Sequence, residues 1–194
     1  MCGLLAVSVS PVVAQRGSAP PPTAAVNAQG AEVNPAGAMV AEFQKRVTAY
    51  MELHEKAATD LPSPTKDATP SDIVKHQREL EARLLPLRKG AKQGDIFTPE
   101  MQKFIRQFLA QVFSGAEGRK LKSAIMDENP VGVKFQVNSR YPDTVPLSTM
   151  PAQVLKALPK VPEGLEYRFI DHALILLDVR AHMIVDFVPK ALPA

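Results

Sequence analysis

The chain has 194 residues, 45% of them hydrophobic, and a formal net charge of +3 from 23 basic and 20 acidic side chains. This excess of positive charge is too small to indicate a nucleic-acid partner. With Cys2 as its only cysteine, the chain can form neither an internal disulfide nor a metal site built on several thiolates, and we expect no cofactor.

The N-terminus has the pattern of a secretory signal peptide over residues 1–14. Its apolar run is too short to span a bilayer, and the small side chains of Val12 and Ala14 suit a signal peptidase. We therefore expect cleavage after Ala14, loss of Cys2, and a periplasmic or secreted protein without a stable membrane anchor. No Lys or Arg precedes the run, which is consistent with a start upstream of Met1. The alternative is an ordinary disordered apolar tail or a short buried element.

The remainder divides by composition into a leader and one domain. Residues 15–34 are rich in Ala, Pro and Gly, with hardly any large apolar side chain, and this composition predicts a disordered leader. A single α+β domain is predicted over 35–194. Its helical part covers 35–128 and its sheet part covers 131–190.

Four helices are predicted in the helical part from apolar residues at helical spacing. The first runs from Pro35 to Ala58, and the second begins at Ser71-Asp72, is kinked by Pro86 and ends near Gly90. The third begins at Thr98-Pro99 and extends to about Val112. A shorter fourth piece, after the interruptions at Gly115 and Gly118, ends before Asn129-Pro130.

The sheet part begins with residues that alternate between apolar and polar over 131–137, which predicts a first strand. After a Pro-rich connection with one short helix, three strands should form an antiparallel meander with very short turns. A two-residue turn at Asp171-His172 would set Ile170 opposite Ala173 and Arg168 opposite Ile175. The predicted short helix and strands are Pro151–Leu158, Leu165–Ile170, Ala173–Val179 and His182–Val188. The fold class is thus three to four helices on an antiparallel sheet of three to four strands.

Strict alternation gives this sheet one apolar face, which the helices should cover. The predicted core residues on that face are Leu165, Tyr167, Phe169, Leu174, Leu176, Met183, Val185 and Phe187. The other face is half apolar and carries the charged and polar side chains Glu166, Arg168, His182 and Asp186. Such a face can be a dimer contact, a ligand groove or the seat of the Pro-rich connection.

The C-terminal part resembles a group of uncharacterised exported bacterial proteins. The resemblance rests on Asn138-Ser139-Arg140-Tyr141-Pro142, Leu155-Lys156-Ala157-Leu158-Pro159, Leu165-Glu166-Tyr167-Arg168-Phe169 and Ile184-Val185-Asp186-Phe187. It covers about the last third of the chain. It implies export, a helical middle and a C-terminal strand cluster, and it implies no activity.

The candidate site lies on the mixed face, where Arg168 and Asp186 would flank the middle strand as a charge pair or around a polar ligand. His172 and His182 flank opposite ends of that strand, too far apart to share a metal ion. His54 and His76 lie on the first two helices, where surface positions are the favoured interpretation. The sequence predicts neither a metal site nor a catalytic residue.

Two functions follow from these patterns. The leading hypothesis is an exported interaction or structural accessory protein without enzymatic activity, whose partner is another protein or a second copy of the chain. Glu166, Arg168, Asp186 and His182 are its predicted ligand or partner surface. The alternative is a small periplasmic hydrolase or metal-handling enzyme that uses the same face of the sheet.

Overall fold

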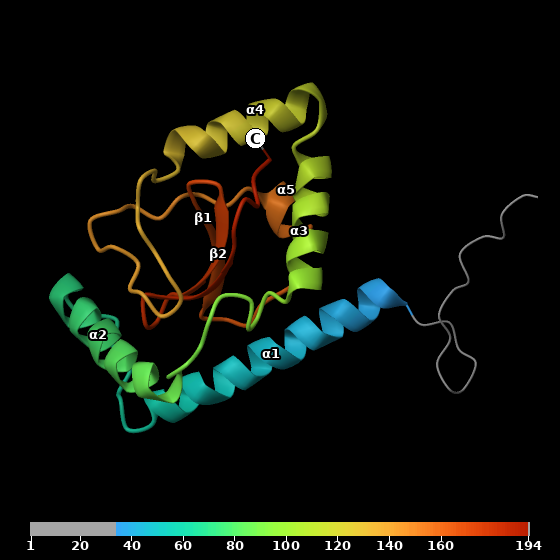
Figure 1. Ribbon diagram of the computed structural model, residues 1–194. Helices are drawn as coiled ribbons and strands as arrows, with labels where there is room; N and C mark the ends of the chain where they lie inside the picture. The colour runs from blue at the N-terminus through green and yellow to red at the C-terminus, as the bar shows by residue number, and fades with distance from the viewer. Residues whose placement is uncertain (1–33, 194) are drawn as a thin grey trace, which may run out of the picture. The chain divides into compact units, whose positions relative to one another are not determined.

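The computed structural model describes residues 34–193, in which five helices surround a three-stranded antiparallel sheet (Figure 1). The predicted signal segment over residues 1–14 and the leader up to residue 33 lie outside the described residues. The α+β architecture predicted from the sequence is confirmed. The elements in chain order are α1 (Pro35–Ala58), α2 (Pro70–Leu87), α3 (Pro99–Val112), α4 (Gly115–Glu128), α5 (Ala152–Leu155), β1 (Leu165–Ile170), β2 (Ala173–Asp178) and β3 (Met183–Val188).

Local start signals explain where α2 and α3 begin. Thr69 caps α2 in a reciprocal capping box: its hydroxyl accepts from the Asp72 N–H, and the Asp72 carboxylate accepts from the Thr69 N–H. The Thr69 hydroxyl also donates to the Asp72 carboxylate at 2.6 Å, and this bond, together with the one from the Thr69 N–H, lowers the pKa of Asp72 below its ordinary value. Thr98 caps α3 by a single bond, with its hydroxyl accepting from the Met101 N–H, and both helices have proline at their first position. Pro86 lies inside the last turn of α2, as predicted.

The hairpin between β1 and β2 has the predicted register. Ile170 pairs with Ala173 and Arg168 pairs with Ile175, across the two-residue turn at Asp171 and His172. Asp171 adopts φ 50°, a left-handed conformation that Asp tolerates better than most residues. The sheet order is β1-β2-β3, so β2 lies in the middle.

A bulge interrupts the pairing of β2 with β3 and corrects the predicted faces. Leu176 pairs with Asp186 and Leu177 with Ile184, so Val185 is an extra residue that the partner strand does not match. Beyond the bulge the alternation is inverted. Asp186 therefore lies on the helix-covered face, and Phe187 lies on the opposite face with Ile175. Strict alternation predicts the reverse for both residues and is wrong for them.

Helices cover one face of the sheet and form the main core with it. α1 contributes Phe43, Val47 and Tyr50, and α3 contributes Met101, Ile105 and Leu109, all nearly inaccessible to solvent. The Phe43 and Phe97 rings stack at 5.6 Å. The sheet residues of this core are Leu165, Tyr167, Phe169, Leu174, Leu176, Met183, Val185 and Val188.

The other face of the sheet is covered by the connection between α4 and α5. Val133, Phe135, Tyr141 and Val145 of that connection pack against a second cluster, formed by the sheet residues Ile170, Ile175, Leu177 and Ile184. This face is therefore the seat of the connection, which is one of the three roles predicted for it. The prediction of a strand over residues 131–137 is wrong. The backbone of this connection pairs with β3 only from Asn138 onward. The predicted helix Pro151–Leu158 is also shorter, covering Ala152–Leu155.

Gly118 permits the close approach of α4 to the end of α3. A Cβ atom there would lie 2.4 Å from the carbonyl carbon of Phe113 and 2.7 Å from the carbonyl oxygen of Val112. Because both are backbone atoms, Gly118→Ala should lower the free energy of unfolding by about 1–2 kcal/mol despite the better helix propensity of alanine. Urea unfolding of the full chain measures this change. The exposed Ser123→Ala in the same helix is the control, and equal stability of the two variants would contradict this close packing.

Candidate functional site

The most enclosed polar cluster joins α1 to the end of β2 through Asp178. Its Oδ2 atom accepts a hydrogen bond from the Tyr50 hydroxyl at 2.5 Å and pairs with Nδ1 of His54 at 2.6 Å. Its Oδ1 atom accepts from the backbone N–H groups of Arg180 and Ala181, both at 2.9 Å. All three side chains of the cluster are at most 2% exposed. Asp178 therefore shapes the turn between β2 and β3 and ties that turn to α1.

His54 corrects the sequence-based interpretation, which places it on the helix surface. It lies on the buried stripe of α1 with Phe43, Val47 and Tyr50, and this helical spacing is the signal that could have found it. Its Nε2 atom is buried without a hydrogen-bond partner among residues 34–193. Burial and the neighbouring Asp178 carboxylate raise the pKa of Tyr50 well above its ordinary value. With these atoms enclosed in the core, the cluster ties α1 to the β2–β3 turn.

Asp186 binds the loop between α2 and α3 in a comparable way. Its Oδ2 atom accepts from the N–H groups of Ile96 and Phe97, both at 2.8 Å, and Oδ1 accepts from those of Gly94 and Phe187. Burial raises the pKa of Asp186, and these N–H donors oppose that shift. The carboxylate is fully enclosed. It is thus unavailable for the ligand role predicted from the sequence.

Glu166 and Arg168 remain near each other on the edge strand β1. Their side chains form an ion pair, and Nη1 of Arg168 also donates to the carbonyl of Tyr167 at 3.0 Å. The predicted pairing of Arg168 with Asp186 across the middle strand is wrong, because the bulge turns Asp186 to the other face. A role of Glu166 and Arg168 as partner surface stays a prediction.

His182 lies at the turn before β3, in the left-handed conformation with φ 54°. Its ring is edge-on to Tyr141 at 5.5 Å, and Nε2 is 3.9 Å from the Asp143 carboxylate. Arg140 holds Asp143 with a bond of 2.6 Å and lowers the pKa of that carboxyl. His172, in contrast, belongs to the β1–β2 turn and is nearest to the neighbouring Asp171. The two histidines thus have separate surroundings, as predicted.

His182 should make stability depend on pH. Burial, with a smaller contribution from Arg140, lowers its pKa, while Asp143 acts in the opposite direction. Below about pH 6.5 the unfolded chain therefore binds a proton that the folded chain does not, and this group's contribution to stability falls as pH falls. His182→Asn keeps a residue that tolerates positive φ but cannot titrate. From about pH 7.5 to about pH 5, the urea midpoint of the wild type should fall more than that of the variant, whereas parallel profiles would contradict this assignment.

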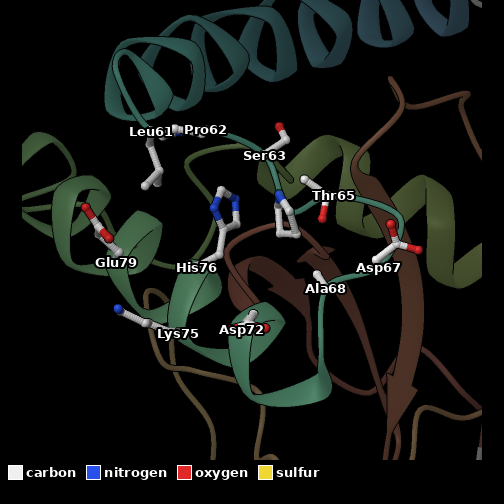
Figure 2. Close-up of a pocket in the computed structure, with 11 residues that line it drawn as sticks. Leu61, Pro62, Ser63, Thr65, Asp67, Ala68, Asp72, Lys75, His76 and Glu79 are labelled. Atoms are coloured by element: carbon white, nitrogen blue, oxygen red, sulfur yellow. The ribbon is translucent and has the colours of Figure 1, made fainter.

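Three adjoining cavities surround the segment between α1 and α2, which we call the Pro loop (residues 61–68). Their volumes are about 410, 660 and 420 Å³, and Ser63 lines all three. His76 projects from α2 toward the loop in the first cavity (Figure 2). Val179 and Arg180 of the β2–β3 turn line the other two cavities. We refer to these three cavities, which share lining residues, as the Pro-loop groove.

The chemistry of the Pro-loop groove is mixed acidic and apolar. Six carboxylate side chains line it, against the two cations Lys75 and Arg180. Arg180 pairs with Glu55 at 3.6 Å, and Arg83 and Arg168, which lie outside the lining, pair with two further carboxylates. The six carboxylates are Glu55, Asp67, Asp72, Glu79, Glu163 and Glu166. Of the predicted site residues, only Glu166 belongs to this groove.

Comparison of the chain with protein-family models, with curated proteins and with solved structures finds no match. Within residues 34–193 there is no group of three or more His, Cys, Asp or Glu side chains arranged to hold a metal ion. No helix in that part of the chain is long and apolar enough to cross a membrane. The resemblance to exported bacterial proteins therefore stays a prediction. The function is inferred from the cavities and charges of residues 34–193.

Proposed function

We propose that the protein is an exported interaction module without enzymatic activity, and that the Pro-loop groove binds an extended, basic and apolar segment of a partner protein. The observation that carries this proposal is the placement of three cavities around one loop, two of them lined by carboxylates and the third by apolar and neutral polar side chains and Arg180. Hollows of about 400–700 Å³ are large enough to receive side chains of a ligand.

Charge supports a basic occupant. Asp67 and Glu163 are both exposed at the groove and have no ion-pair partner among residues 34–193. The chain as a whole is positively charged, so this local acidity is not a consequence of overall composition. A Lys or Arg side chain near these carboxylates would be attracted to them and would associate faster at low salt.

Apolar contacts would supply the rest of the binding surface. Ile73 on the exposed face of α2 is 42% exposed and lines the third cavity together with Pro64 and Val179. Leu61 and Pro62 line the first cavity. Because apolar and acidic positions are interspersed around the Pro loop, a segment with interspersed basic and apolar residues fits it better than a purely charged one.

Binding is favoured over hydrolysis by the arrangement of the reactive residue types. Ser63 and His76 line the same cavity, yet no hydrogen bond joins them or joins His76 to a carboxylate within residues 34–193. A nucleophilic serine needs a neighbouring base within hydrogen-bond reach. The alternative site predicted from the sequence is divided between two faces of the sheet, because Asp186 is enclosed beneath the helices.

Export is proposed on the sequence of residues 1–14 alone. Expression of the full gene with its own N-terminus in a bacterial host should yield a periplasmic chain that begins at Gln15. Mass spectrometry of the purified protein measures that N-terminus. An uncleaved chain retained inside the cell would contradict export and would leave the groove proposal to be tested separately.

The groove proposal is tested with a short synthetic peptide in which Lys alternates with Leu and Pro. We expect measurable binding by calorimetry, and about tenfold weaker binding after Asp67→Asn combined with Glu163→Gln. Ile73→Ser should also weaken binding, since it removes apolar contact area. Asp127→Asn, a charge change on α4 outside the groove, should leave the affinity unchanged.

The same peptide with Glu in place of Lys separates charge recognition from simple adhesion. It should bind much more weakly than the basic peptide, and the difference should shrink at high salt. Equal binding of both peptides, or an effect of Asp127→Asn as large as that of the groove variants, would contradict the proposal.

A further inference from the structure

A separate groove of about 400 Å³ lies between α1 and the loop that follows α2. Ala49, Leu53 and Leu87 provide apolar walls, and Tyr50 and Arg88 line it from the interior. No lining residue is shared with the Pro-loop groove. We call it the Arg88 groove, and its most unusual feature is Arg88 itself, a buried cation.

Arg88 is a buried cation without a carboxylate partner. It is 7% exposed, and it forms no ion pair within the described part of the chain. Its Nε atom donates to the side-chain oxygen of Asn138 at 2.6 Å, and Nη2 donates to the carbonyl of Val185 at the bulge at 2.7 Å. Both acceptors are neutral. Buried charges in proteins are normally paired, so an unpaired guanidinium needs an explanation.

The surroundings hold this guanidinium in one orientation. Its central carbon lies 4.8 Å from the centre of the Tyr50 ring, in the geometry of a cation–π contact. Burial lowers the pKa of Arg88, which is the direction expected when lost hydration is incompletely replaced. Asp186, Asp95 and Asp178 act on it only from a distance, since each is occupied by its own hydrogen bonds. Nη1 has no hydrogen-bond partner among residues 34–193, and it is not fully shielded from solvent.

The groove carries an excess of positive charge. Arg46 and Lys89 line it together with Arg88, against the single carboxylate of Asp95. That carboxylate accepts from the N–H of Lys92, and Nη1 of Arg46 is held by the carbonyl oxygen of Asp95 at 2.6 Å. Arg46 also pairs with Glu42 at 2.8 Å. An anion that enters the groove would therefore meet the buried guanidinium of Arg88 and the exposed Lys89, neither of which forms an ion pair within residues 34–193, and Arg46, which Glu42 already pairs.

We propose that the Arg88 groove binds a small organic anion, with its carboxylate directed at Nη1 of Arg88 and its apolar body against Ala49, Leu53 and Leu87. A carboxylate matches the planar donors of a guanidinium. The apolar walls favour a ligand with a short hydrocarbon part over a bare inorganic anion. The bound anion would supply the missing partner of Arg88, and this role is independent of the Pro-loop groove.

The test uses sodium hexanoate as the probe and follows backbone amide signals of the full chain by NMR. Hexanoate should shift the signals of Gly90 and Ala91 in a saturable manner. Hexanol, which lacks the charge, and phosphate at equal ionic strength, which lacks the apolar body, should each bind at least about tenfold more weakly. Saturable hexanoate binding at other signals only would overturn the proposal.

Variants at accessible positions avoid unfolding the protein through Arg88 itself. Ala49→Leu fills the groove from an exposed position of α1 and should abolish hexanoate binding, while Ala41→Leu, exposed on the same helix, should not. Arg46→Gln should weaken binding about tenfold, and Lys45→Gln, which lies outside the groove, should have no effect. The proposal would be overturned if the wild type did not bind hexanoate or if phosphate bound as tightly as hexanoate. It would also be overturned if Ala49→Leu left hexanoate binding unchanged.

Discussion

Asp178→Ala should lower the free energy of unfolding by about 4 kcal/mol, more than any other single substitution proposed for this chain. The change leaves the Tyr50 hydroxyl and His54 Nδ1, both enclosed in the core, without their acceptor. It also releases the two backbone N–H groups that shape the β2–β3 turn. Removing one partner of a buried network costs more than the net value of its bonds, because the remaining groups stay desolvated. Urea unfolding of the full chain measures the loss.

Two further variants separate the parts of this effect. Asp178→Asn retains one acceptor oxygen for the turn but presents an amide N–H₂ to Tyr50 and His54, so its cost should be smaller than that of alanine. Tyr50→Phe removes one donor and should lower the free energy of unfolding by about 1–2 kcal/mol. The same substitution should have a smaller effect in the Asp178→Ala background. Additive effects of the two substitutions would contradict direct coupling between these residues.

Asp186→Ala should lower the free energy of unfolding by about 3 kcal/mol. The variant leaves the N–H groups of Ile96 and Phe97, both buried in the core, without a hydrogen-bond acceptor. It also releases the loop that leads into α3. Hydrogen exchange of these two amides should accelerate more than that of amides in β1. This readout distinguishes a loop anchor from a general loss of packing.

Asp95→Ala provides the comparison for that experiment. Its side chain binds the N–H of Lys92 in the same loop, at a more exposed position. We expect a cost below about 1 kcal/mol and little change at Ile96 and Phe97. Equal protection loss in the two variants would show that Asp186 has no special role in fixing the loop.

Regular periodicity makes much of the fold predictable from the sequence. The bounds of α1 and β1 follow from proline, apolar spacing and turn residues, and the β1–β2 register follows from the two-residue turn at Asp171 and His172. These features depend on neighbours close in the sequence. Predicting them therefore requires no knowledge of how the helices pack on the sheet.

Features that depend on distant partners are not predictable in this way. The bulge at Val185 has no local sequence signal, and it alone moves Asp186 from the predicted surface into the core. Residues 131–137 alternate as a strand does, because Val133 and Phe135 pack against the sheet, yet the segment covers the sheet and does not extend it. Alternation reports which side chains are buried and not which backbone groups are paired.

The candidate sites differ in how much the sequence reveals. Helical spacing places His54 on the apolar stripe of α1, but nothing in the sequence joins it to Asp178. The Pro-loop groove forms only when the α1–α2 connection meets the β2–β3 turn, which lies more than a hundred residues further along the chain. Arg88 resembles any other charged residue in the sequence until the structure shows it enclosed without an ionic partner.

Binding of a basic and apolar segment in the Pro-loop groove can be mapped by following the amide signals of the full chain during titration with the Lys-Leu-Pro peptide. We expect the largest shifts at Ser63, His76 and Arg180, which line the cavities around the loop. These shifts should be lost when Asp67→Asn and Glu163→Gln are combined. Shifts confined to other surfaces, or an equal response to the Glu-containing peptide, would show that the groove does not bind such a segment.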